Sequence, residues 1–142
     1  MDDGFDLLWQ YYLDTCFLLS QPISDGVSFA IITAHNPLGE VLTPSQNRLR
    51  DRALQQDIAQ LQVPYRMIVG AAPDLSHMEK SWALFTSRPQ ALQLATKYQQ
   101  NAFYYVNCGV VYLIPCLKGR HVGEMGRFCQ RVRIVPELPD GV

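Results

Sequence analysis

The chain has 142 residues, of which 48% are hydrophobic and 18% charged, and its 12 Lys and Arg against 13 Asp and Glu leave a formal net charge of −1. These totals predict a single globular domain over residues 1–142 and exclude an intrinsically disordered chain, which would be poor in apolar residues and highly charged. The balanced charge does not indicate bulk duplex DNA as a partner, and no apolar run reaches the roughly 18 to 20 residues of a membrane span.

The first elements are a helix and two strands. Residues 5–13 carry apolar side chains at helical spacing, and residues 13–19 alternate as in a strand. We therefore expect an N-terminal helix or extension over residues 1–11 that runs into a strand at about residues 12–19. Residues 27–34 are a continuous apolar run, which predicts a strand buried on both faces. This strand ends at His35-Asn36-Pro37, because proline lacks the backbone donor and restricts the residue before it.

Two helices follow, each with a recognisable start. Thr43-Pro44-Ser45-Gln46 reads as a capping box with proline in the first turn, and Pro64 ends this helix. Residues 65–70 predict a strand, residues 71–80 a polar loop, and residues 81–85 another strand. Ser87-Arg88-Pro89-Gln90 repeats the capping pattern at the start of the second helix.

The C-terminal part is expected to be strand-rich. Residues 102–106 and 110–115 flank Asn107-Cys108-Gly109, whose Asn and Gly tolerate positive φ, so a hairpin is predicted. Residues 117–127 are glycine-containing and basic and are expected to form a mobile loop before a last strand at about residues 128–135.

This order of elements predicts an α+β or α/β fold. We expect one mixed sheet of about five to seven strands with two main helices packed on one face. Each strand–helix–strand passage should return as a parallel pair, and the hairpins should add antiparallel edges.

Metal and cofactor signals are missing from the sequence. The four cysteines form no C-x-x-C pair, and the three histidines are far apart. Free thiols in a reducing cytoplasm are the simplest interpretation, and the acidic start of the chain lacks the basic region that opens a secretory signal. We therefore expect a cytoplasmic chain with no metal and no cofactor. Its oligomeric state and its partners stay open.

The residues that could carry chemistry are polar side chains at strand ends. No phosphate-binding loop, dinucleotide fingerprint, nucleophile elbow or zinc-protease motif is present. The candidates for a ligand site are Thr33, Asn36, Asn47, Ser81, Gln100 and Asn101, and the candidate catalytic residue is the carboxylate Glu79.

Four segments carry a family resemblance: FAIITAHNP, PSQNRLRDRAL, EKSWALF and YQQNAFYY. In this order and spacing, over about residues 10–116, they resemble the bacterial DUF3293 family of uncharacterised proteins. The resemblance marks Thr33, Ala34, Asn36, Pro37, Gln46, Asn47, Glu79, Ser81, Gln100, Asn101 and Ala102. It departs at Gln99, where the family usually has the glycine that suits a left-handed helix end. It also argues against His35 as a general base, because that position varies in the family.

Two interpretations of these residues stay open. In one, each residue is structural: Asn36 forms a turn before proline, Gln100 and Asn101 cap a helix, and Glu79 is an exposed charge. In the other, they converge at strand ends and form an amide-rich pocket for a small polar ligand or a protein segment. The chain would then be a binding or regulatory module, or an enzyme with Glu79 as general acid/base.

A nucleic-acid role is a further alternative. Arg48 and Arg52 share a helix face, and residues 103–105 offer three aromatic rings for base stacking. The competing interpretation is that the charges are solvated faces and the rings belong to the core. The candidate residues for this role are Arg48, Arg52, Lys118, Arg120, Arg131 and Arg133.

Overall fold

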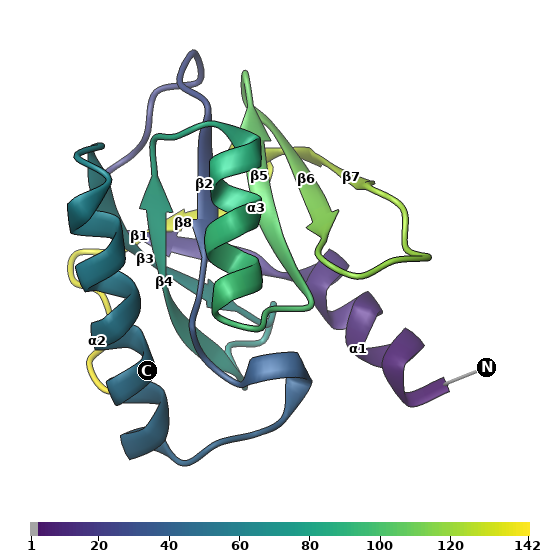
Figure 1. Ribbon diagram of the computed structural model, residues 1–142. Helices are drawn as coiled ribbons and strands as arrows, with labels where there is room; N and C mark the ends of the chain where they lie inside the picture. The colour runs from purple at the N-terminus through teal and green to yellow at the C-terminus, as the bar shows by residue number, and fades with distance from the viewer. Residues whose placement is uncertain (1–2) are drawn as a thin grey trace.

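Figure 1 shows the computed structural model of the chain, which describes residues 3–142. Eight strands and three α-helices make up the described part. In chain order the helices and strands are α1 (Asp3–Asp14), β1 (Cys16–Leu19), β2 (Phe29–Ile32), α2 (Pro44–Gln60), β3 (Tyr65–Ala71), β4 (Met78–Leu84), α3 (Arg88–Lys97), β5 (Ala102–Asn107), β6 (Val110–Pro115), β7 (Gly123–Arg127) and β8 (Val132–Ile134).

The strands form a single sheet in the order β7-β6-β5-β2-β4-β3-β1-β8. Neighbouring strands are antiparallel except β1 and β8, which pair in parallel. The fold is therefore α+β, and its eight strands exceed the five to seven that were predicted. The expected parallel pairing was wrong in one respect. Strands joined through a helix do run parallel, but one antiparallel strand lies between them: β4 between β2 and β3, and β2 between β4 and β5.

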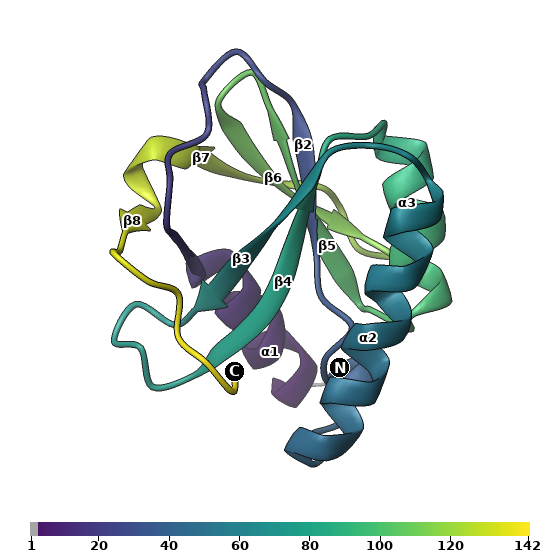
Figure 2. The same ribbon diagram turned by 90° about the vertical axis from the view of Figure 1, so that its left-hand side faces the viewer.

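The helices cover both faces of the sheet. Helices α2 and α3 lie side by side on one face, and α1 lies on the other, as Figures 1 and 2 show from two directions. The prediction of two main helices on one face is confirmed for α2 and α3, and α1 is a third helix. Strand β2 serves both cores, since Ala30 and Ile32 pack beneath α2 and α3 while Phe29 and Ile31 pack on the α1 side. The continuous apolar run correctly predicted this double burial.

Several element boundaries differ from the prediction, including the last strand expected at about residues 128–135, where Phe128–Gln130 form a 3-10 helix and β8 covers Val132–Ile134. Helix α1 continues to Asp14, so the strand that was expected from residue 12 begins at Cys16. Strand β4 begins at Met78, because it pairs with β3 along its whole length, and the expected polar loop is correspondingly shorter. Strand β7 pairs with β6 and occupies the second half of the segment that was expected to be a loop.

The helix ends follow the local signals in the sequence. Thr43 caps α2 in a complete capping box with Gln46, and the Ser87 hydroxyl accepts a hydrogen bond from the Gln90 amide at the start of α3. Helix α3 ends in a Schellman motif, in which the Gln100 amide donates to the Ala95 carbonyl. Gln99 takes the left-handed conformation there, with φ 58°, although it is not glycine. Within residues 3–142 no helix is long and apolar enough to cross a membrane.

Candidate functional site

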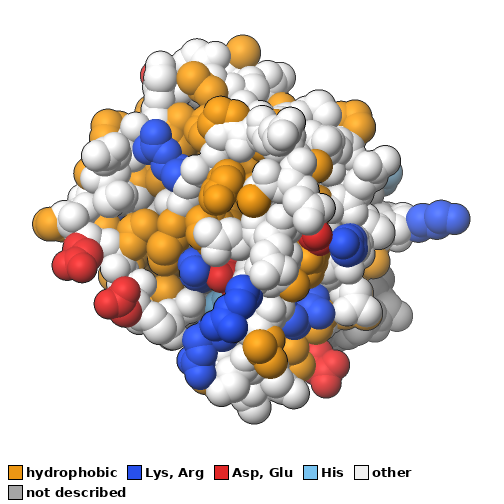
Figure 3. Space-filling model, turned by 60° about the vertical axis from the view of Figure 1, so that its left-hand side comes forward, with side chains coloured by type: hydrophobic (Ala, Val, Ile, Leu, Met, Phe, Trp, Pro, Cys, Tyr) orange, Lys and Arg blue, Asp and Glu red, His pale blue; other side chains and the backbone are white. Residues whose placement is uncertain are grey.

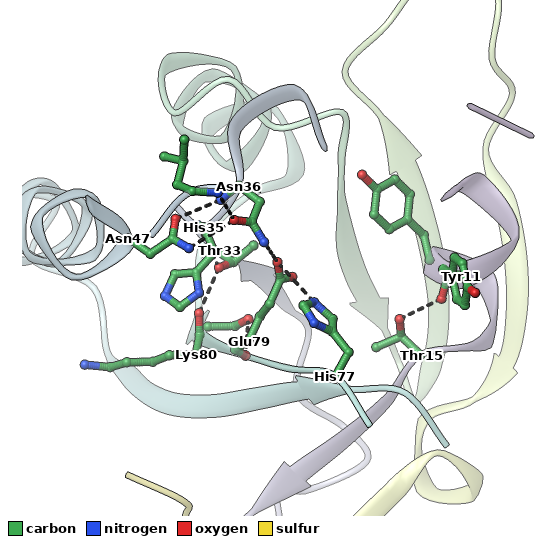
Figure 4. Close-up of polar contacts among 12 residues, drawn as sticks. Tyr11, Thr15, Thr33, His35, Asn36, Asn47, His77, Glu79 and Lys80 are labelled. Atoms are coloured by element: carbon green, nitrogen blue, oxygen red, sulfur yellow. Dashed lines mark hydrogen bonds and ion pairs between the residues drawn. The ribbon is translucent and has the colours of Figure 1, made fainter. Parts of the chain in front are cut away.

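The site begins where β2 ends, at Asn36. This residue has a left-handed backbone, with φ 51° and ψ 66°, which places its side chain between two other elements. Its Oδ1 accepts hydrogen bonds from the Leu42 amide and from Nδ2 of Asn47, both at 3.0 Å. In return, the Asn36 amide donates to Oδ1 of Asn47 at 3.0 Å. The two asparagines therefore fix the end of β2 against the first turns of α2 (Figure 4).

The remaining donor of Asn36 reaches the only carboxylate among the predicted site residues. Asn36 Nδ2 donates to Oε1 of Glu79 at 3.1 Å, and Nε2 of His77 lies 3.5 Å from the same oxygen. The Glu79 side chain is one-quarter exposed, whereas that of His77 is 65% exposed. The contact with Glu79 raises the pKa of His77 above its ordinary value, because the carboxylate favours the protonated imidazole. The geometry therefore holds a carboxylate and an imidazole together.

The Glu79 side chain lines a cavity of about 320 Å³ between the sheet and α1. Figure 4 shows Tyr11 and Thr15 of the α1 region across from Glu79 and His77. The lining residues are of two kinds. The polar ones include Thr15, Thr33, His35, Asn36, Ser76, His77, Glu79, Ser81 and Gln100, and the apolar and aromatic ones include Leu8, Tyr11, Tyr12, Ile31, Val41, Phe103, Tyr104 and Leu113.

The aromatic side of the cavity is anchored by hydrogen bonds. The Tyr12 hydroxyl accepts a hydrogen bond from Nδ2 of Asn101 at 3.1 Å, and the Tyr104 hydroxyl donates to the Tyr12 carbonyl at 2.9 Å. Burial raises the pKa of Tyr12, and the negative charge of Glu79 adds to this effect. Burial also raises the pKa of Tyr104, so both phenols stay protonated at neutral pH and can donate hydrogen bonds. The end of α1 is tied to the sheet through these contacts.

The structure brings most of the predicted site residues together. Thr33, Asn36, Glu79, Ser81 and Gln100 line the cavity, whereas Asn47 and Asn101 support it from behind. The amides are largely engaged within the protein: Gln100 Nε2, for example, donates to the carbonyls of His35 and Tyr98. The amide set is thus mainly a frame that positions Glu79, rather than a row of free ligand donors.

Sequence reasoning missed His77 and the whole contribution of α1. His77 lay in a segment that was expected to be a loop, and no motif or spacing singled it out. Tyr12 was recognised only as part of an apolar helical pattern, and Tyr11 was not singled out. His35 is a buried neighbour of the cavity whose pKa is lowered, chiefly because burial disfavours the charged imidazole. The position of α1 depends on long-range packing, such as the approach of Leu8 to Gly39, which no sequence motif indicates.

The candidate nucleic-acid residues do not gather on one surface. Arg48 and Arg52 are exposed on α2, where Figure 3 shows basic side chains interspersed with acidic and hydrophobic ones. Arg120 pairs with Asp6 of α1, with Nη2 2.5 Å from Oδ1. Arg131 donates to the carbonyls of Leu13, Thr15 and Met125, so it holds the chain together. Arg133 donates to the Pro73 carbonyl, and Lys118 lies in the segment between β6 and β7.

Metal ligands are not grouped in the described part of the chain. Among residues 3–142, no cluster of three or more His, Cys, Asp or Glu side chains could hold a metal ion. The pair of Glu79 and His77 lies in the cavity without a third such ligand. Glu79 and His77 themselves offer hydrogen bonding, charge and proton transfer.

Comparison with known families identifies the chain. The family described as "Protein of unknown function (DUF3293)" matches residues 32–103. The chain belongs to the DUF3293 family. The matched region of this DUF3293 chain begins at the end of β2 and ends in β5, so it contains Asn36, Asn47, Glu79 and Gln100 but not α1. Searches of curated proteins and of solved structures found no match to the chain.

Proposed function

We propose that this chain is a binding module whose cavity takes a small polar ligand, with Glu79 as the central recognition group. The observation that carries the proposal is the carboxylate itself, held by Asn36 at the edge of a 320 Å³ cavity and facing an aromatic wall. Ligand sites are commonly concave and mostly apolar, with a few fixed polar groups that set orientation. A volume near the lower end of that class suits a small ligand rather than a protein segment.

The test is a screen of small polar compounds followed by two matched variants. Binding is measured by changes in the backbone amide NMR signals of cavity residues such as Thr33 and Ser81. We expect at least one compound class to give saturable changes that Glu79→Gln weakens. Glu124→Gln, which alters an exposed carboxylate on β7, should leave binding unchanged. If no compound shifts the cavity signals, or if both variants behave alike, the proposal is wrong.

An enzyme that uses Glu79 as general acid/base is the second candidate. It is supported by the 3.5 Å approach of His77 to Glu79, since an imidazole beside a carboxylate can take up or release a proton near neutral pH. The test follows a bound compound by NMR over time. Conversion of the compound by the wild type, with binding but no conversion by Glu79→Gln, is the expected result. A ligand that stays chemically unchanged with the wild type would contradict this role.

The predicted place of action is the cytoplasm, which the sequence supports through four cysteines without a disulfide pattern. All four are free in the structure: Cys16, Cys108, Cys116 and Cys129. The measurement is fractionation of the natural host cell with an antibody against this chain. Recovery in the soluble cytoplasmic fraction is expected, and recovery with an extracytoplasmic fraction would contradict the prediction.

A further inference from the structure

The charges around the cavity restrict the kind of ligand it can take. Glu79 is the one carboxylate among the described residues that line it, and no Lys or Arg of the described chain lines it. Two basic residues close to lining residues, Lys80 beside Glu79 in sequence and Arg50 at the Ala34 carbonyl, are engaged elsewhere. Lys80 pairs with Asp51, with Nζ 2.9 Å from Oδ2, and Arg50 donates to the Ala34 carbonyl. His35 favours its neutral form because it is buried. An anionic ligand would therefore meet the Glu79 carboxylate, and the imidazole beside it, His77, is already paired with that carboxylate.

The hydrogen bonds of Glu79 leave one oxygen for a ligand. Oε1 receives the Asn36 amide and the His77 contact. Within residues 3–142, the structure records no hydrogen bond or ion pair to Oε2. A carboxylate oxygen accepts hydrogen bonds only, so the group that satisfies Oε2 must be a donor. A positively charged donor gives the shorter and stronger bond.

The opposite wall is suited to the body of such a ligand. Leu8, Tyr11 and Tyr12 of α1 present an apolar and aromatic surface across the cavity from Glu79, and Tyr104 lies on the sheet beside them. The faces of aromatic rings attract cations, and their area favours a flat apolar group. The mouth is partly open, since Tyr11 is 60% exposed.

We propose that the cavity binds a small organic cation: a primary ammonium or amidinium group placed on Oε2 of Glu79, with a flat apolar body against the tyrosines of α1. This inference rests on the proposed function and specifies its ligand class. It requires neither a metal nor a second copy of the chain. The proposal depends on the positive charge of the ligand.

Three probes of similar size and shape test the charge directly. Benzylammonium is the cation, benzyl alcohol the neutral analogue, and benzoate the anion. Each is titrated into the full chain while the backbone amide NMR signals of Thr33, Ser81 and Gln100 are followed. We expect saturable shifts with benzylammonium and no saturable shifts with benzoate. The affinity for benzyl alcohol should be weaker than that for benzylammonium by a factor of about ten or more. This comparison uses the wild type and does not depend on a variant that folds.

Two variants then locate the effect. Glu79→Gln keeps the size of the side chain and removes its charge, and should weaken benzylammonium binding about tenfold or more while a dispersed NMR spectrum shows that the fold is kept. Glu124→Gln is the control for the loss of one negative charge elsewhere and should bind as the wild type does. Equal affinity for the alcohol and the cation, stronger binding of benzoate, or unchanged binding by Glu79→Gln would overturn the cation assignment.

The outcomes also separate this inference from the proposed function. Saturable cavity shifts with benzyl alcohol or benzoate, but not with benzylammonium, would overturn the cation class while the cavity remained a binding site. Absence of binding by benzylammonium overturns the inference as well. The proposed function itself fails only if the wider set of polar compounds also leaves the cavity signals unchanged.

Discussion

Replacement of Asn36 by alanine should destabilise the chain strongly, because this side chain joins three elements. Its side chain makes hydrogen bonds to the Leu42 amide, to Asn47 and to Glu79. Each neutral bond contributes about 1 kcal/mol, and the bond to the carboxylate about 1.5–3 kcal/mol. Alanine also fits the left-handed backbone of residue 36 less well than asparagine, which adds about 1 kcal/mol. These contributions add to about 4.5–6 kcal/mol, and water that reaches the one-quarter exposed Glu79 carboxylate in the variant offsets part of them, so we expect a loss of about 3–5 kcal/mol in the free energy of unfolding.

The assay is chemical denaturation, supported by thermal unfolding. For a chain of this size, 1 kcal/mol corresponds to a change of roughly 3 °C in Tm, so the variant should melt about 10 °C lower or more. Asn36→Gly separates the two causes, because glycine adopts the left-handed backbone freely while also lacking the side chain. It should be about 1 kcal/mol more stable than Asn36→Ala.

A double-mutant cycle with Asn47 provides the stricter control. One hydrogen bond, from Nδ2 of Asn47 to Oδ1 of Asn36, joins the two side chains, so their substitutions to alanine should be coupled by roughly 1 kcal/mol. A loss of less than about 1 kcal/mol for Asn36→Ala, or additive effects in the cycle, would refute the argument that this pair is the frame of the site. In that case the contacts would contribute no more than ordinary surface hydrogen bonds.

Three further perturbations test other parts of the fold. Gln99→Gly should stabilise the chain by about 0.5–1 kcal/mol in chemical denaturation, because residue 99 has positive φ. Gln93→Gly, at an exposed position in the middle of α3, should destabilise it by about as much. Changes of the same sign in the two variants would contradict this prediction. Because burial lowers the pKa of His35 below 6.5, the folded state binds fewer protons than the unfolded state, so stability should fall as pH drops below about 6.5. Denaturation of the wild type and His35→Phe at about pH 7.5 and about pH 5.5 should show the smaller loss in the variant, and equal losses would exclude His35 as the cause. Arg131→Met should cost about 2–4 kcal/mol, since this guanidinium binds carbonyls at the end of α1, and Arg48→Met, at an exposed position, should change stability by less than about 0.5 kcal/mol.

Local signals in the sequence predicted the parts of the fold that depend on neighbouring residues. The proline and capping residues of Thr43-Pro44-Ser45-Gln46 fixed the start of α2, and the apolar run at residues 27–34 located a strand that is buried on both faces. The turn at Cys108-Gly109 has positive φ at both residues, one of which is the glycine that suggested a hairpin. In these places the decisive interactions lie within a few residues of each other.

The remaining features depend on packing between distant segments. Helix α1 has an apolar stripe that could cover either face of a sheet, and its position is fixed by contacts such as Asn101 to Tyr12. Strand β4 starts earlier than its polar first residues suggested, because pairing with β3 stabilises half-buried positions that carry no alternating pattern. Strand β7 was missed for the same reason, since its sequence is short, polar and glycine-containing. No single-segment pattern reports such pairings.

The sequence predicted the polar residues of the candidate site but not the residues that α1 contributes to it. Strands β2 and β4 are antiparallel neighbours, with Ile32 opposite Trp82, so the end of β2 lies beside the start of β4. This pairing brings Asn36 to Glu79 although 43 residues separate them. The family resemblance marked both residues without showing what each one does. The structure separates their roles, since Asn36 is saturated within the protein and Glu79 faces the cavity.

The residues that hold Glu79 and the residues of the aromatic wall across the cavity come from different parts of the chain. The DUF3293 match covers residues 32–103 and therefore includes the asparagines that hold Glu79, but α1 lies outside it. The residues that hold the carboxylate thus lie within the matched region, and under the proposed function they determine where a donor group of the ligand binds. The shape and aromatic character of the opposite wall come from Leu8, Tyr11 and Tyr12. The proposed ligand would therefore contact two segments of the chain, and experiments that search for it must use a protein that includes α1.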